Sequence, residues 1–108
     1  MPWTPLCQSE HLPLRTQLQM SENDQRLLLY RDPYSRKVYA LYNHNPLTLG
    51  ANLHQGEVVH IGEHPVLSVN HAHFSLATGD CLEIPAMAVE VVRTREWQQQ
   101  IEIYLPTH

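Results

Sequence analysis

Short apolar runs separated by turn residues are the feature that most restricts the fold of this 108-residue chain. Such runs, repeated about every 8–12 residues, are typical of antiparallel β-sandwiches and barrels, and helix signals are poor. We therefore predict an all-β fold in a single domain over residues 1–108. The predicted strands are 27–31, 38–42, 57–61, 65–69, 72–76, 88–93 and 101–105.

Turn residues predict how the first two of these strands pair. Residues 27–31 and 38–42 flank Asp32-Pro33-Tyr34-Ser35, in which proline suits the second position of a turn, so they are predicted to form a hairpin. Thr78-Gly79-Asp80 predicts a second tight turn in which Gly79 adopts a positive φ.

Three other segments carry weaker signals. The polar stretch 16–25 predicts a loop or one turn of helix, and residues 95–100 predict a long turn in the last hairpin. The strand 101–105 alternates apolar and polar residues, which predicts that Glu102 faces away from the core. Arg31, Arg36 and Lys37 are predicted to form a solvated hairpin end.

Composition excludes several classes of function. A net charge of −4 argues against a nucleic-acid-binding protein that neutralises phosphates. No apolar run approaches the roughly 18 residues of a membrane span, and the first ten residues do not resemble a signal peptide. Two cysteines, Cys7 and Cys81, are too few for a four-thiolate site and predict a reduced, intracellular protein. Both are predicted to be structural thiols, because neither follows a sequence pattern that lowers a thiol pKa.

Eight histidines include one pair with metal-ligand spacing. If residues 71–73 are extended, His71 and His73 point to the same face and are candidates for chelating one metal, with His60 and His64 as further ligands. The alternative is that they are simply exposed side chains. His-x-His followed by Gly79-Asp80 and Ile84-Pro85 also resembles a cupin, although the spacing between the two motifs is too short.

Two stretches resemble the ligand loops of Rieske-type domains. The first runs from Val38 through Asn43-His44-Asn45-Pro46 to Gly56, and the second is Phe74-Ser75-Leu76-Ala77-Thr78-Gly79-Asp80-Cys81. Trp3 and Leu6-Cys7 are similar to the opening strand of such domains. The resemblance implies an antiparallel β-sandwich with long former cluster-binding loops.

A Rieske [2Fe–2S] cluster needs two cysteines on one iron and two histidines on the other. Counting back from Gly56 and Phe74 places the four ligand positions on other residue types, so the resemblance implies a Rieske-like domain without its cluster. These four positions are Pro46, Thr48, Leu67 and Asn70.

A Rieske-like chain of this length without the ligands resembles the small subunit of NAD(P)H-dependent nitrite reductase. Asn43-His44-Asn45-Pro46 and the run from Phe74 to Glu83 match that family's pattern. The resemblance implies a cytoplasmic accessory subunit with no cofactor and no catalytic residue of its own. Its expected partner is the large subunit, which carries siroheme, [4Fe-4S] and FAD and reduces nitrite to ammonium in nitrate assimilation.

The former ligand loops, residues 43–53 and 67–73, are the predicted contact surface for that subunit, because they place leucines between polar residues. The alternative is that these leucines fill the space that a cluster would occupy. A stand-alone cupin-like or mononuclear metal protein using His71 and His73 is the second functional hypothesis. The candidate interface residues are Asn45, Leu47, Leu49, Leu53, Leu67, Asn70 and His71.

Overall fold

The computed structural model describes residues 3–22, 25–42, 56–69 and 71–104. Within these ranges the chain forms ten β-strands and two short 3-10 helices, η1 (Ser9–His11) and η3 (Pro85–Met87). Neither helix is long or apolar enough to cross a membrane. The strands are β1 (Trp3–Gln8), β2 (Gln17–Glu22), β3 (Gln25–Arg31), β4 (Val38–Tyr42), β5 (Glu57–Ile61), β6 (His64–Val69), β7 (Ala72–Ser75), β8 (Val91–Val92), β9 (Thr94–Trp97) and β10 (Gln100–Tyr104).

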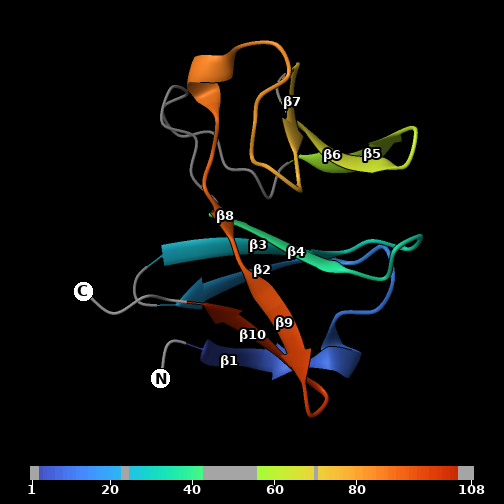
Figure 1. Cartoon of the computed structure of the whole chain (residues 1–108), viewed down its shortest axis with the longest axis vertical. Helices are drawn as coiled ribbons and strands as arrows, with labels where there is room; N and C mark the ends of the chain where they lie inside the picture. Colours follow the sequence, from blue (N-terminus) through green and yellow to red (C-terminus); the bar gives the residue numbers. More distant parts are fainter. Residues whose placement is uncertain (1–2, 23–24, 43–55, 70, 105–108) are drawn as a thin grey trace.

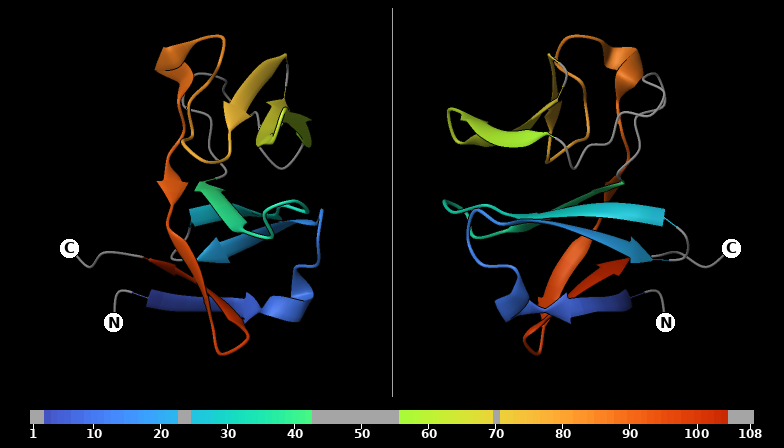
Figure 2. Two further views of the ribbon diagram at one scale, coloured as in Figure 1. Left: turned by 45° about the vertical axis from the view of Figure 1, so that its right-hand side comes forward. Right: turned by 180° about the vertical axis from the view of Figure 1, so that it is seen from behind.

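The strands pair antiparallel in three sheets, which lie one above another in Figure 1. The lower sheet has the order β1-β10-β9, the central sheet β2-β3-β4-β8, and the upper sheet β5-β6-β7. Figure 2 shows the same order from two other sides, with the segment of β8 and β9 running from the upper part of the molecule to the lower. The predicted all-β architecture is confirmed.

The central sheet is buried on both faces, with one core on each side. Successive side chains of a strand point to opposite sides, so one strand can contribute to both cores. In β3, Leu27 and Leu29 enter the lower core, whereas Leu28 and Tyr30 enter the upper core. This double burial explains why β3 is a continuous apolar run. The lower core comprises Leu12, Leu27, Leu29, Ala40, Val92, Ile101 and Ile103. The upper core comprises Leu28, Tyr30, Leu41, Leu67, Val69, Phe74, Leu76, Cys81, Met87 and Val89.

Two predicted turns are confirmed, and a third hairpin joins two of the predicted strands. The β3–β4 hairpin turns through Asp32-Pro33-Tyr34-Ser35, with Arg31 opposite Val38. The predicted strands 57–61 and 65–69 form the β5–β6 hairpin around Gly62. Gly79 has a φ of 80°, as expected for a tight turn.

The prediction of a loop or helical turn at residues 16–25 is wrong. Residues 17–22 form β2, which pairs with β3 from Gln17 to Glu22. Leu18 and Met20 alternate with the exposed Gln19 and pack against the lower core. The glutamines made the segment look irregular, although its two apolar residues have strand spacing.

The predicted long turn at residues 95–100 is also wrong. Residues 94–97 form β9, and only Gln98 and Gln99 connect it to β10, with φ of 52° and 65°. Positive φ at both central residues is the geometry of a two-residue hairpin turn, in which glycine and asparagine are usual. Glutamine does not signal this turn, so pairing with β10 determines it instead.

One further expectation for the C-terminal part needs correction. Only Val91–Val92 of the predicted strand 88–93 pair with a neighbour, opposite Leu41 and Ala40 of β4. Glu102 faces away from the core, as predicted, since Ile101 and Ile103 on either side of it are in the lower core. Glu102 is nevertheless only 8% exposed, and its Oε1 lies 2.6 Å from Arg95 Nε. The guanidinium carbon of Arg95 also lies over the rings of Trp3 and Trp97, at 4.4 and 5.6 Å from their centroids.

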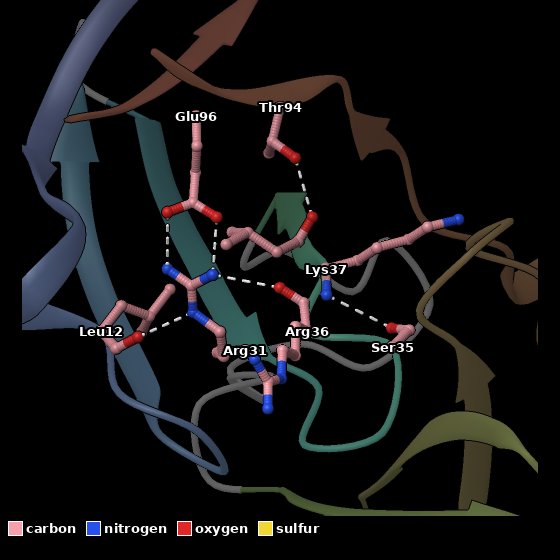
Figure 3. Close-up of polar contacts among 8 residues, drawn as sticks. Leu12, Arg31, Ser35, Arg36, Lys37, Thr94 and Glu96 are labelled. Carbon is pink, nitrogen blue, oxygen red and sulfur yellow. Dashed lines mark hydrogen bonds and ion pairs between the residues drawn. The ribbon is translucent and has the colours of Figure 1, made fainter. Parts of the chain in front are cut away.

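Arg31 is not part of a solvated hairpin end, contrary to the prediction. Its guanidinium holds Glu96 through two hydrogen bonds of 2.6 and 2.9 Å, and also donates to the carbonyl oxygens of Leu12 and Arg36 (Figure 3). The hydrogen bonds from Arg31 lower the pKa of Glu96. This network joins the central sheet to the lower sheet.

We expect Arg31→Met to lower the free energy of unfolding by about 2 kcal/mol, because four hydrogen bonds are lost and one of them leaves a carbonyl unpaired near the core. The measurement is urea denaturation followed by circular dichroism. Arg26→Met, at an exposed position of the same strand, is the matched control and is expected to change stability by less than about 0.5 kcal/mol. Equal losses in both variants would contradict the role given to Arg31.

Candidate interaction surface on the upper sheet

Only some of the predicted site residues belong to the described part of the chain. Pro46, Thr48 and Asn70, together with Asn45, Leu47, Leu49 and Leu53, lie outside the described residues. Leu67 is in β6, opposite Val58 and Phe74, and is 0% exposed. Leu67 therefore packs inside the upper core and is not a surface contact. This agrees with the alternative in which the leucines fill the space that a cluster would occupy.

The prediction that His71 and His73 share one face of a strand is wrong. β7 begins at Ala72, so His71 belongs to the preceding turn, where its φ is 67°. His73 is in the strand, and its Nδ1 lies 2.6 Å from Glu83 Oε2. The backbone N–H of His73 also donates to Glu83 Oε1 at 2.8 Å. These backbone and imidazole hydrogen bonds lower the pKa of Glu83.

His60 pairs with a carboxylate far away in sequence. Its Nε2 lies 2.7 Å from Oδ1 of Asp32, which is 1% exposed, and the Tyr34 ring packs edge-on against the imidazole. The backbone N–H and hydroxyl of Ser35 donate to the other Asp32 oxygen at 2.8 and 2.7 Å. The pair links the β3–β4 turn to β5, and therefore the central sheet to the upper sheet.

Hydrogen bonding determines the charge state of Asp32. Burial acts to raise its pKa, but the hydrogen bonds from His60 and Ser35 outweigh burial and lower it. The sequence predicts Asp32 at the start of a turn, where aspartate commonly accepts a hydrogen bond from the backbone of its own turn. Its pairing with His60, 28 residues away, was missed, since no local pattern connects the two.

The four histidines considered as metal ligands do not converge. His60 is bound to Asp32, His73 to Glu83, and His64 is exposed at the start of β6. Across residues 3–22, 25–42, 56–69 and 71–104, no group of three or more His, Cys, Asp or Glu side chains is placed to hold a metal ion. The geometry of the described part therefore does not support the metal hypothesis.

The two cysteines lie in different cores. Cys7, in β1, is half-buried against the lower core, and Cys81 is buried in the upper core. The central sheet lies between the two cores. Burial raises the pKa of the Cys7 thiol more than nearby Arg31 lowers it. Their positions match the prediction of structural thiols.

Large apolar side chains are exposed on the upper part of the molecule. Val59 and Ile61 lie on β5, and Leu82 and Ile84 lie on the segment after β7. The backbone N–H of Leu82 donates to the His73 carbonyl at 2.8 Å, so this segment runs beside β7. Several exposed apolar side chains in one region are typical of an interaction surface.

Comparison with protein families gives one match that covers nearly the whole chain. Residues 2–104 match the model described as a Rieske-like [2Fe-2S] domain. The chain belongs to this family. The predicted Rieske-like fold is thereby confirmed. None of the curated proteins matches the sequence significantly.

Solved structures agree with the Rieske-like fold. A protein assigned as the small subunit of an NADPH nitrite reductase is 25% identical, with a TM-score of 0.80 over 95% of this chain and 98% of its own. A protein from Mycobacterium tuberculosis, assigned as an NADH-dependent nitrite reductase small subunit, is 24% identical, with a TM-score of 0.85 over 98% and 96%. The ferredoxin of carbazole 1,9a-dioxygenase from Nocardioides aromaticivorans is 15% identical, with a TM-score of 0.80 over 98% and 100%.

The cysteine positions of this Rieske-like domain do not fit a Rieske cluster. Such a cluster needs two cysteines on one iron atom, and the chain has only Cys7 and Cys81. Because these occupy opposite sides of the central sheet, they do not converge on one iron. The family description and the residues present in this chain therefore disagree.

Proposed function

We propose that this chain is a non-catalytic accessory subunit of NAD(P)H-dependent nitrite reductase. In this proposal it works in the cytoplasm by binding the large subunit, which carries siroheme, [4Fe-4S] and FAD and reduces nitrite to ammonium in nitrate assimilation. The observation that carries the proposal is the end-to-end match to a nitrite reductase small subunit, at 25% identity over 95% of one chain and 98% of the other.

The cysteine positions support the accessory role over an electron-carrying one. The fold alone does not separate the two, since a dioxygenase ferredoxin matches equally well. A ferredoxin of the Rieske type needs its paired cysteines on one iron, whereas Cys7 and Cys81 lie in separate cores. We therefore propose that the domain acts by binding and has no redox centre of its own.

Complex formation tests this proposal. The chain is mixed with the purified siroheme-containing large subunit from the same organism and separated by size-exclusion chromatography. We expect the chain to elute with the siroheme absorbance at a fixed stoichiometry, and the isolated chain to show no absorption band in the visible region. A chain that elutes separately at every ratio, or that carries an iron–sulfur spectrum after anaerobic purification, would contradict the proposal.

A further inference from the structure

Positive charge is distributed very unevenly along the chain. All seven Lys and Arg residues lie before residue 38 or after residue 92. Residues 38–92, which include the whole upper sheet, contain no Lys or Arg, and with His neutral their formal charge is −5, compared with −4 for the whole chain. Their carboxylates are Glu57, Glu63, Asp80, Glu83 and Glu90.

Strand register determines which side chains of the upper sheet face outward. Residues paired directly across antiparallel strands share one face. Val58, Leu67 and Phe74 form one registered row, and all three belong to or pack against the upper core. The adjacent row, Glu57, Ser68 and His73, therefore faces away from that core. Leu82 extends this outer row, because its neighbour Cys81 faces inward opposite Phe74.

The outer face combines apolar side chains with carboxylates. It carries Val59 and Ile61 in alternation with the inward-facing His60, and Leu82 beside His73. Ile61 and Leu82 are each 53% exposed. Glu57 is exposed at the beginning of β5, and Glu83 holds His73 at the other side of the sheet. We define the outer face by Glu57, Val59, Ile61, His64, His73 and Leu82.

We infer that this outer face is the docking surface for the large subunit, and that the matching surface of that subunit is apolar at its centre and rich in Lys and Arg around it. The inference rests on the proposed function. Exposed aliphatic side chains supply the area that leaves water on association, and complementary charge at the rim accelerates association and selects the partner. The outer face carries the carboxylate of Glu57, with Glu83 beside it, and residues 38–92 contain no Lys or Arg, so this face complements a cationic partner.

The opposite end of the molecule has a different character. On the outer side of the lower sheet, Arg95 is bound to Glu102 and packed against Trp3 and Trp97. Arg93 lies over the rings of Trp3 and Tyr104. The charged and aromatic side chains at this end therefore contact one another within the lower sheet. Arg93 is exposed and provides a charge-reversal control at this end.

The test uses matched substitutions and the purified large subunit. Leu82→Lys places a cation on the outer face, and Leu14→Lys, at a leucine that is 47% exposed near the central sheet, is its control. Glu57→Lys reverses a charge on the outer face, with Glu10→Lys as the control at an exposed glutamate in η1. Binding is measured by biolayer interferometry at low and high NaCl, and folding of each variant by circular dichroism.

We expect Leu82→Lys and Glu57→Lys each to weaken binding at least about tenfold, whereas the two controls change it less than about twofold. For the unchanged chain, Kd is expected to rise with NaCl, because screening weakens attraction between exposed charges. Binding of the unchanged chain with no difference between outer-face and control variants would overturn this inference and leave the proposed function standing. The inference is equally overturned if Arg93→Glu, rather than Leu82→Lys, abolishes binding. A chain that binds in no form contradicts the proposed function itself.

Discussion

Gly79→Ala is expected to lower the free energy of unfolding by about 3–5 kcal/mol, since an added methyl group meets both backbone strain and a steric clash. Gly79 has a φ of 80°, a conformation that residues with a Cβ rarely adopt. A Cβ at this position would lie 2.1 Å from the Val89 carbonyl oxygen. That oxygen is backbone and cannot rotate away.

The segment that the methyl group would displace is itself fixed. Gly79 donates its backbone N–H to the Ser75 carbonyl, and Val89 donates its N–H to the Gly79 carbonyl at 2.8 Å. Val89 is buried in the upper core. A shift of the Val89 backbone therefore disturbs both the turn after β7 and the packing beneath it.

Gly62→Ala is the matched control. Gly62 has a φ of 63°, but a Cβ there would have no neighbour within 4 Å. The control therefore measures backbone strain alone, which we expect to cost about 1 kcal/mol. Urea denaturation of both variants gives the difference. Equal destabilisation by the two substitutions would show that the predicted clash with Val89 adds nothing to the cost of the methyl group at Gly79.

Asp32→Ala is expected to lower the free energy of unfolding by about 3 kcal/mol, because it removes a buried carboxylate that accepts three hydrogen bonds and leaves their donors without an acceptor. The substitution removes the partner of His60 and the acceptor for the N–H and hydroxyl of Ser35. Asp80→Ala, at an exposed aspartate, is expected to change stability by less than about 0.5 kcal/mol.

The contribution of Asp32 depends on pH in a defined direction. Its pKa in the folded state is lowered, so the folded protein favours the carboxylate. The stabilisation is fully present above the pKa of the unfolded chain, about 3.9, and is lost as the pH falls through the lower folded-state value. The difference in unfolding free energy between the unchanged chain and Asp32→Asn should therefore shrink between about pH 5 and pH 2. A difference that stays constant or grows on acidification would contradict an ionised Asp32 in the folded protein.

Local patterns in the sequence predicted most of the strands that define this fold. The β3–β4 and β5–β6 hairpins follow directly from apolar runs interrupted by Asp32-Pro33 and by Gly62, because turn residues and strand propensity act over a few positions. β2 was missed, since only Leu18 and Met20 carry its apolar face. The two-residue turn at Gln98-Gln99 was missed because pairing between β9 and β10, rather than residue type, imposes its positive φ.

Side-chain pairs that are distant in sequence could not be predicted from local patterns. Nothing near Asp32 indicates His60, and nothing near Arg31 indicates Glu96, 65 residues away. The sequence predicts a solvated hairpin end for Arg31 and a turn for Asp32, whereas the fold brings each against a partner from another sheet. His71 and His73 failed as a pair for a local reason, because the strand begins between them. The outer face could not be predicted either, because only the strand register brings Glu57 and Leu82, which are far apart in sequence, onto one face.

The pairing of the first and last strands has a consequence for how the domain can be built into larger polypeptides. Trp3 pairs with Tyr104, so the two ends of the described chain leave the fold side by side at the lower sheet (Figure 1). Neighbouring ends allow a domain to be inserted into a loop of another protein with little distortion of its host. Both strands belong to the lower sheet, at the opposite end of the molecule from the upper sheet (Figure 1). The same fold is therefore suited to serve as a separate subunit or as a module spliced within a longer chain.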